Sequence, residues 1–200
     1  MRSGFDGVVL AGGDSTRMGR DKALVRLPSG ATLLENAVDS LRKAGAGRIW
    51  VSRAHHDPAD IGCAATCIPD LLSRRGPAGG MLTALTELST EPLVFLPCDM
   101  PRIPVAWLRR LGRRAREDLR RPMVTVSGAG RLQPLVCALP QGCLPPLANA
   151  VALGHLAVGR LLSDLDASAL QGLEEIALLN VNHYATVRHL EQMPGGPACC

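Results

Sequence analysis

Short hydrophobic runs alternate along the chain with amphipathic stretches. The runs that have the length and bounding turns of buried strands are residues 7–10, 48–52, 93–96, 123–126 and 135–139. Apolar residues at helical spacing occur at residues 79–88, 104–116, 156–165 and 184–192. Strands that alternate with helices predict an α/β domain built around a mainly parallel sheet.

The first helix has the clearest local signals. Thr32 and Glu35 have the spacing of a capping box, in which each side chain bonds to the other residue's backbone N–H. Gly45 is suited to end the helix, because glycine readily adopts the left-handed conformation found there. The apolar residues between these two ends follow a helical period and are Leu33, Leu34, Ala37, Val38 and Leu41.

Composition indicates one globular domain over residues 1–200, with a core at about 5–192 and a flexible tail at 193–200. Hydrophobic residues make up 46% of the chain and charged residues 20%, which argues against disorder. The longest apolar runs are far too short to span a bilayer, and the first thirteen residues make a poor secretory signal. We therefore expect a cytoplasmic protein without a membrane partner.

Aromatic content and net charge limit the classes of ligand that we expect this protein to bind. Only five aromatic residues exist, too few to stack a nucleic-acid strand, and the net charge of +4 is mild. A small acidic ligand such as a nucleotide suits this balance better than a nucleic acid. The seven cysteines contain no CxxC pair, so we expect free thiols and no zinc site.

The first candidate site is the glycine-rich segment after the first predicted strand. Gly12 and Gly13 let the backbone approach a ligand closely, and Arg17 and Lys22 add positive charge at the same strand end. This combination suits a nucleoside triphosphate. The spacing matches neither a Walker A loop nor GxGxxG, so the segment alone is also compatible with an ordinary turn.

Two further segments carry candidate chemistry. Asp99 follows an apolar strand, at the edge where open α/β sheets bind ligands, and a carboxylate there can hold Mg²⁺. Asp70 follows a shorter apolar strand and could accept hydrogen bonds from a nucleoside. It precedes the glycine-rich residues 76–80, which predict a helix start that favours anions. Taken singly, each segment could also be a plain loop.

Together these segments resemble the molybdenum cofactor guanylyltransferase (MobA-like) family of nucleotidyltransferases. The resemblance rests on LAGG-x-S-x-RMG-x-DKA at residues 10–23, PD at 69–70, G-P-x-x-G at 76–80 and PCDMP at 97–101. Two weaker segments agree, Gln133-Pro-Leu135 and Asn180-Val-Asn182. The motifs lie within residues 5–192, nearly the whole chain. Many relatives have N-x-N-T-P where this chain continues as His183-Tyr184 after Asn182, a departure on the pterin side.

The resemblance implies a Rossmann-like three-layer sandwich of the nucleotide-diphospho-sugar transferase type. It implies an enzyme that uses GTP and Mg²⁺ to transfer GMP onto the terminal phosphate of molybdopterin, releasing pyrophosphate. By position, the implied nucleotide-binding residues are Leu10, Ala11, Gly12, Gly13, Lys22, Ser52, Asp70 and Asp99. The implied catalytic residues are Arg17, Lys22 and Asp99, with Asp99 as the metal ligand, and the acceptor side is Gly79, Asn180 and Asn182. Relatives that transfer CMP tend to carry alanine where Gly12 stands, so Gly12 favours GTP.

Two other functions stay open at this stage. One is a nucleotidyltransferase of the same fold that acts on another phosphorylated acceptor, of the cytidylyl or sugar-phosphate type. The other is a GTP-binding module without catalysis, against which Lys22 and Asp99 argue. We interpret the arginine-rich segment 109–121 as a solvated helix face. Its alternative is docking of an acidic partner, such as a cofactor donor or a recipient molybdoenzyme.

Overall fold

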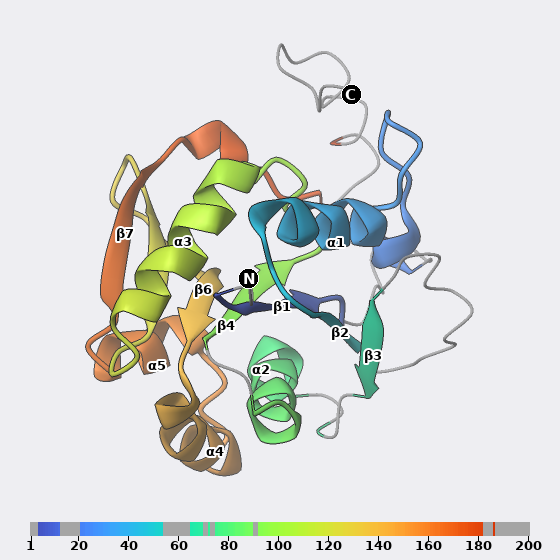
Figure 1. Cartoon of the computed structure of the whole chain (residues 1–200). Coiled ribbons are helices and arrows are strands. Elements are labelled where there is room, and N and C mark those ends of the chain that lie inside the picture. The colour runs from blue at the N-terminus through green and yellow to red at the C-terminus, as the bar shows by residue number, and fades with distance from the viewer. Residues whose placement is uncertain are drawn as a thin grey trace.

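One sheet lies at the centre of the molecule (Figure 1). The computed structural model describes residues 4–12, 21–53, 65–69, 72, 75–89, 92–181 and 186. Within them the sheet has seven strands in the order β3-β2-β1-β4-β6-β5-β7. The strands are β1 (Asp6–Leu10), β2 (Ile49–Arg53), β3 (Thr66–Pro69), β4 (Leu93–Pro97), β5 (Met123–Ser127), β6 (Leu132–Leu139) and β7 (Ser168–Leu173).

The sheet is mainly parallel, as the alternation of strands and helices predicts. β1 pairs in parallel with both β2 and β4, β2 with β3, and β5 with β7. Only β6 runs in the opposite direction to its neighbours β4 and β5 in the described sheet. The carboxyl ends of β1, β2, β3 and β4 therefore meet at one edge.

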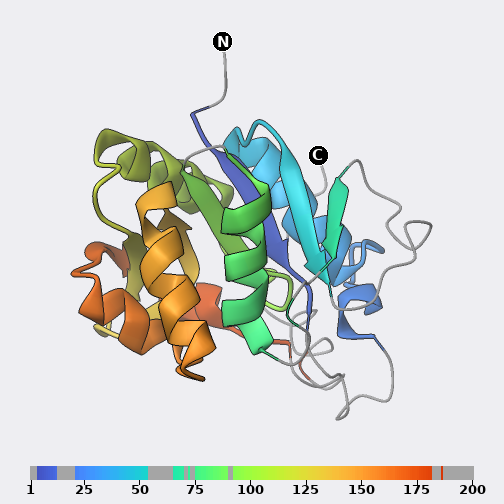
Figure 2. The ribbon, with the colours of Figure 1, turned by 90° about the horizontal axis from the view of Figure 1, so that it is seen from below.

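Helices cover both faces of the sheet and complete a three-layer sandwich. Helices α1 (Leu33–Ala44) and α3 (Val105–Glu117) lie on one face (Figure 1). Helices α2 (Gly76–Glu87), α4 (Leu144–Ala152) and α5 (Val158–Asp164) lie on the other, which Figure 2 shows from below. The described residues also form the short 3₁₀ helices η1 (Lys22–Leu24), η3 (Gln141–Cys143) and η4 (Glu175–Leu178).

Alternation along the strands produces two cores. In β1, Val9 packs with the α1 and α3 side chains, whereas Val8 and Leu10 pack with those of α2. Successive side chains of a strand point to opposite faces, so a buried strand must be apolar on both sides. This explains why β4 and the Val8–Leu10 part of β1 are continuous apolar runs, and both strands are buried along their whole length.

Helix α1 confirms the local signals of the sequence. The Thr32 side chain accepts a hydrogen bond from the Glu35 N–H at 3.1 Å, and the Glu35 carboxylate accepts one from the Thr32 N–H at 2.7 Å. The hydrogen bond from Thr32 stabilises the ionised carboxyl, so the pKa of Glu35 lies below its ordinary value. Gly45 ends the helix at a φ of 98°, in the left-handed region.

Several element boundaries differ from the predicted ones. Helix α2 begins three residues earlier than predicted, at Gly76, and β6 extends to include Leu132. The pattern missed α4, which opens on Leu144-Pro-Pro, and β7, a strand of mixed composition that contains Gly172. Glycine and proline are poor markers of regular structure, so tertiary packing determines both elements. Of the helix predicted at 184–192, the structure describes only residue 186, which is helical.

The arginines of α3 lie at the surface. Arg109 donates to the Lys43 carbonyl at 2.7 Å, Arg116 to the Gly4 carbonyl at 3.1 Å, and Arg114 pairs with Glu117 at 3.0 Å. Exposed pairs of this kind add little stability each. Within the residues that the structure describes, no helix has the length and hydrophobicity to cross a bilayer.

Candidate active site

The candidate site is built on the carboxyl ends of β1, β2 and β4. In register, Leu10 lies opposite both Ser52 of β2 and Pro97 of β4. The Ala11 N–H donates to the Ser52 carbonyl at 3.0 Å, and the Cys98 N–H donates to the Leu10 carbonyl at 3.1 Å. The chain thus leaves β1 between its two neighbours, and Gly12 emerges exposed at the edge. In open α/β sheets this edge is the usual ligand-binding position.

Lys22 and Asp99 meet at this edge. The Lys22 ammonium donates to a carboxylate oxygen of Asp99 at 2.8 Å, although the residues are 77 positions apart. Their side chains are 22% and 25% exposed, so each is accessible to a ligand while being held by its surroundings. The structure therefore brings together two of the three residues that the sequence predicts to be catalytic.

The first turn of α2 reaches the same edge. A Cβ atom on Gly80 would lie 2.6 Å from the Ser52 hydroxyl oxygen and 3.4 Å from a Leu10 methyl carbon. Only glycine permits this approach without a shift of its neighbours. Gly79, predicted on the acceptor side, is buried in the same turn. The N-terminus of a helix carries partial positive charge, which favours an anion at this edge.

The segment after η4 returns to Asp99. The Val181 N–H donates to the Asp99 backbone carbonyl at 2.8 Å. Asn180, predicted on the acceptor side, is therefore next to a residue in contact with Asp99, and it is exposed. Asn180, which is far from both residues in the sequence, is thus available near the Lys22–Asp99 pair.

Four predicted site residues, Gly13, Arg17, Asp70 and Asn182, lie outside the described residues. Their assigned roles stay predictions. The residues that the structure does place at the edge, directly or through an adjoining turn, are Leu10, Ala11, Gly12, Lys22, Ser52, Gly79, Asp99 and Asn180.

Sequence reasoning missed an ion pair beside Lys22. The Asp21 carboxylate accepts a hydrogen bond from the Arg53 guanidinium, and its other oxygen accepts one from the Ala23 N–H at 2.9 Å. Asp21 thereby caps η1, the turn that carries Lys22. An aspartate directly before a short helical turn is a capping signal that could have identified it. Arg53, the partner of Asp21 on β2, has no comparable local signal in the sequence.

Cys98, the residue before Asp99, is unsuited to act as a nucleophile. It is buried, and desolvation raises the pKa of its thiol to about 12, with a further contribution from the nearby Asp99 charge. The thiol is therefore neutral at physiological pH, whereas the nucleophilic form of cysteine is the thiolate.

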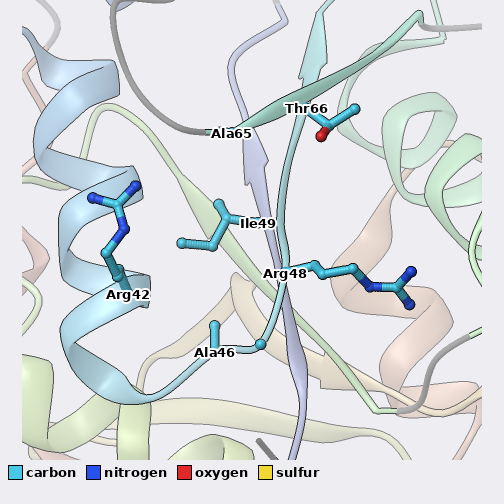
Figure 3. A pocket seen from close by; sticks show the side chains of 7 residues that line it. Arg42, Ala46, Arg48, Ile49, Ala65 and Thr66 are labelled. Atoms are coloured by element: carbon cyan, nitrogen blue, oxygen red, sulfur yellow. The ribbon is translucent and has the colours of Figure 1, made fainter.

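A polar hollow lies elsewhere, between the end of α1 and the first residues of β2 and β3 (Figure 3). Arg42 comes from α1, Arg48 from the residue before β2, Ile49 from the start of β2, and Thr66 from β3. Because β2 and β3 run parallel to β1, this hollow is at the opposite end of the sheet from Lys22 and Asp99. The glycine-rich motifs converge on the edge that carries Lys22 and Asp99 and not on this hollow.

Comparison with known proteins identifies the family. The family model described as the MobA-like NTP transferase domain matches residues 7–169, which contain most of β1, Lys22, α2 and Asp99. The chain belongs to the MobA-like NTP transferase family. The resemblance seen in the sequence motifs is thereby confirmed. A protein of Rhodopirellula baltica named probable molybdenum cofactor guanylyltransferase is 33% identical over 183 residues, covering 88% of this chain and 86% of the relative.

Solved structures share the MobA-like fold. Molybdopterin-guanine dinucleotide biosynthesis protein A from Archaeoglobus fulgidus superposes with a TM-score of 0.71 at 20% identity, covering 94% of this chain and 97% of that one. The Mycobacterium tuberculosis protein Rv0371c, crystallised in complex with manganese, has a TM-score of 0.64 at 20% identity, covering 94% and 98%. At these identities the likeness establishes the three-layer nucleotidyltransferase fold, as predicted.

Proposed function

We propose that this protein transfers GMP from GTP to the terminal phosphate of molybdopterin and releases pyrophosphate. The observation that carries the proposal is the Lys22–Asp99 pair at the carboxyl edge of the sheet, beside the glycine-rich end of β1. Support comes from the relative named probable molybdenum cofactor guanylyltransferase, 33% identical over most of both chains.

The reaction joins two anions, so positioning and charge compensation matter more than a strong base. An oxygen of the acceptor phosphate forms a bond to the α-phosphorus of GTP, while the bond from that phosphorus to the bridging oxygen of pyrophosphate breaks. The electron pair of the broken bond leaves on pyrophosphate. Lys22 would donate to the triphosphate and stabilise the charge that develops on the leaving group.

The donor set fits a magnesium ion. Asp99 offers a carboxylate that is 25% exposed, a hard oxygen ligand of the kind that Mg²⁺ takes. No group of three or more His, Cys, Asp or Glu side chains forms a metal cage among the residues that the structure describes. A single carboxylate suits Mg²⁺, which keeps several waters and takes its other ligands from phosphate. When bound, the ion would neutralise charge on the triphosphate. The manganese in the Rv0371c structure supports a divalent cation in this fold.

The nucleoside would bind where β1 and β2 end. Leu10, Ala11 and Gly12 form the backbone at this edge, and Ser52 lies beside them at the end of β2. Gly80 lets the start of α2 pack directly against Ser52 and Leu10 at this edge. The acceptor would enter from the side of Asn180.

Pyrophosphate release tests the proposal. Purified protein and Mg²⁺ are incubated with each nucleoside triphosphate, and with molybdopterin or a panel of sugar phosphates as acceptors. We expect release only with GTP and molybdopterin together. Release with CTP or with a sugar phosphate would support a different transferase of the same fold. GTP binding without release to any acceptor would support a non-catalytic module.

A further inference from the structure

Arg53 is a buried cation at the carboxyl end of β2, next to the candidate site. Its side chain is 8% exposed, whereas the other arginine of the same strand region, Arg48, has a side chain that is 61% exposed. Alternation along β2 directs Arg53 to the face of the sheet that carries α1, opposite to Ser52, which lies against Gly80 of α2. On that face Arg53 reaches Asp21, the residue that precedes Lys22.

The contacts of Arg53 lead to Lys22 through one residue. The Arg53 guanidinium pairs with the Asp21 carboxylate, which also accepts the Ala23 N–H at 2.9 Å and so closes η1 around Lys22. Lys22 then pairs with Asp99 at 2.8 Å. Charges alternate along the series Arg53, Asp21, Lys22 and Asp99, which links β2 to β4 across the edge of β1.

Stability alone does not explain Arg53. Burying a guanidinium has a large desolvation cost, and apolar replacements of a buried ion pair are often neutral or stabilising. In addition, the Nη1 nitrogen of Arg53 is buried without a hydrogen-bond partner among the described residues. An unpaired buried donor destabilises the folded protein. A role in function therefore explains this buried, incompletely paired cation beside the candidate site better than stability does.

We propose that Arg53 is a positioning residue, which acts through Asp21 to hold Lys22 in place at Asp99. The inference rests on the proposed function, because it assigns Arg53 to the same reaction. Without Arg53, the Asp21 carboxylate loses its link to β2, and the turn at residues 22–24 is tied to the sheet less firmly. Lys22 would then spend less time at the triphosphate position.

The first test measures the position of Lys22 without any substrate. The sequence contains two lysines, Lys22 and Lys43, whose side chains are 22% and 62% exposed. Their rates of acetylation by acetic anhydride are followed by peptide mass spectrometry. In Arg53→Met we expect Lys22 to react several-fold faster than in the unaltered protein, with Lys43 unchanged. An unchanged Lys22 rate in a folded Arg53→Met would overturn the proposal.

The matched control is Arg48→Met. Arg48 also forms an arginine–aspartate pair, with Asp6 at 3.0 Å, but it lies directly before β2, at the opposite end of the strand from the candidate site. We expect this variant to leave both lysine rates and turnover unchanged. A rise in the Lys22 rate for Arg48→Met as well would mean general loosening of the sheet and would count against a specific role.

The second test compares kcat with Tm, in order to separate an effect on the position of Lys22 from an effect on folding. Asp21→Asn leaves Arg53 as an unpaired buried cation and should be less stable than Arg53→Met. The double variant Arg53→Met/Asp21→Asn removes that cation, so its Tm should recover relative to Asp21→Asn. Its kcat should stay below that of the unaltered protein, by up to about 100-fold, and the KM for GTP should change less. Recovery of kcat together with the Tm would show a merely structural role.

The double variant also distinguishes indirect from direct action. If Arg53 works through Asp21, the double variant should have the same kcat as the less active of the two single variants. Both substitutions break the same Arg53–Asp21 contact, so the second one removes nothing further. Multiplied losses would mean that Arg53 contacts the nucleotide itself, which would overturn the proposal. Absence of turnover in the unaltered protein would refute the proposed function, while the lysine rates would still test the link.

Discussion

Replacing Gly80 by alanine tests the close approach of α2 to the ends of β1 and β2. The new Cβ atom would lie 2.6 Å from the Ser52 hydroxyl oxygen, and real Cβ contacts essentially never fall below 3.0 Å. Ser52 is only 3% exposed, so its hydroxyl has little space to move away. The first turn of α2 or the end of β2 must therefore shift.

The magnitude follows from two opposing effects. Overpacking a filled site costs typically about 1–3 kcal/mol, and alanine in place of a helical glycine returns about 0.5–1 kcal/mol. Ser52→Ala removes the clashing oxygen and leaves the Ser52 Cβ at 3.5 Å, an ordinary contact. The effect of Gly80→Ala should thus differ by about 1–3 kcal/mol between the Ser52 and Ala backgrounds.

Urea unfolding of the four proteins (unaltered, both single variants and the double variant) measures this difference. A thermal melt can measure the same difference, since in a domain of this size each kcal/mol of stability corresponds to about 2–4 °C in Tm. Gly159→Ala is the control, since it is also helical but its new Cβ would have its nearest neighbour at 3.6 Å, so it should be neutral or stabilising. Equal effects of Gly80→Ala in both backgrounds would refute the proximity of α2 and Ser52. We also expect Gly80→Ala to raise the KM for GTP.

Three further predictions concern the site, the core and pH. Asp99→Asn should lower the kcat for pyrophosphate release by at least about 100-fold at nearly unchanged Tm; near-normal turnover would remove Asp99 from the reaction. Gly112→Ala places a Cβ 2.4 Å from the Phe5 ring and should lower the free energy of unfolding in urea by about 1–3 kcal/mol. Gly142→Ala, with open space around it, should not, and equal stability of the two variants would contradict the packing. Burial raises the pKa of Cys98 from 9.0 to about 12, so its thiol ionises first in the unfolded chain, and stability should fall as pH rises from about 9 to 12. Cys98→Ala should reduce that slope in urea titrations across this range, and an identical slope would disprove the assignment.

The local features of this protein could be predicted from its sequence. The Thr32–Glu35 capping box and the left-handed Gly45 involve residues within one helix, so their spacing alone specifies them. The apolar runs that form β4 and most of β1 are equally local, because a strand buried on both faces is mainly hydrophobic. The glycine-rich motifs identified the family for the same reason, since each is a short segment whose residues act together.

The pairing between distant segments was decided only by the tertiary structure. Lys22 meets Asp99 across 77 positions, and Asp21 meets Arg53 because β2 lies beside β1 in a register that no local pattern reports. The reversed direction of β6 and the approach of Gly80 to Ser52 depend in the same way on how strands and helices pack. Periodicity describes which face of an element is apolar, whereas partners across the sheet depend on strand order and register, and these result from packing the whole chain at once.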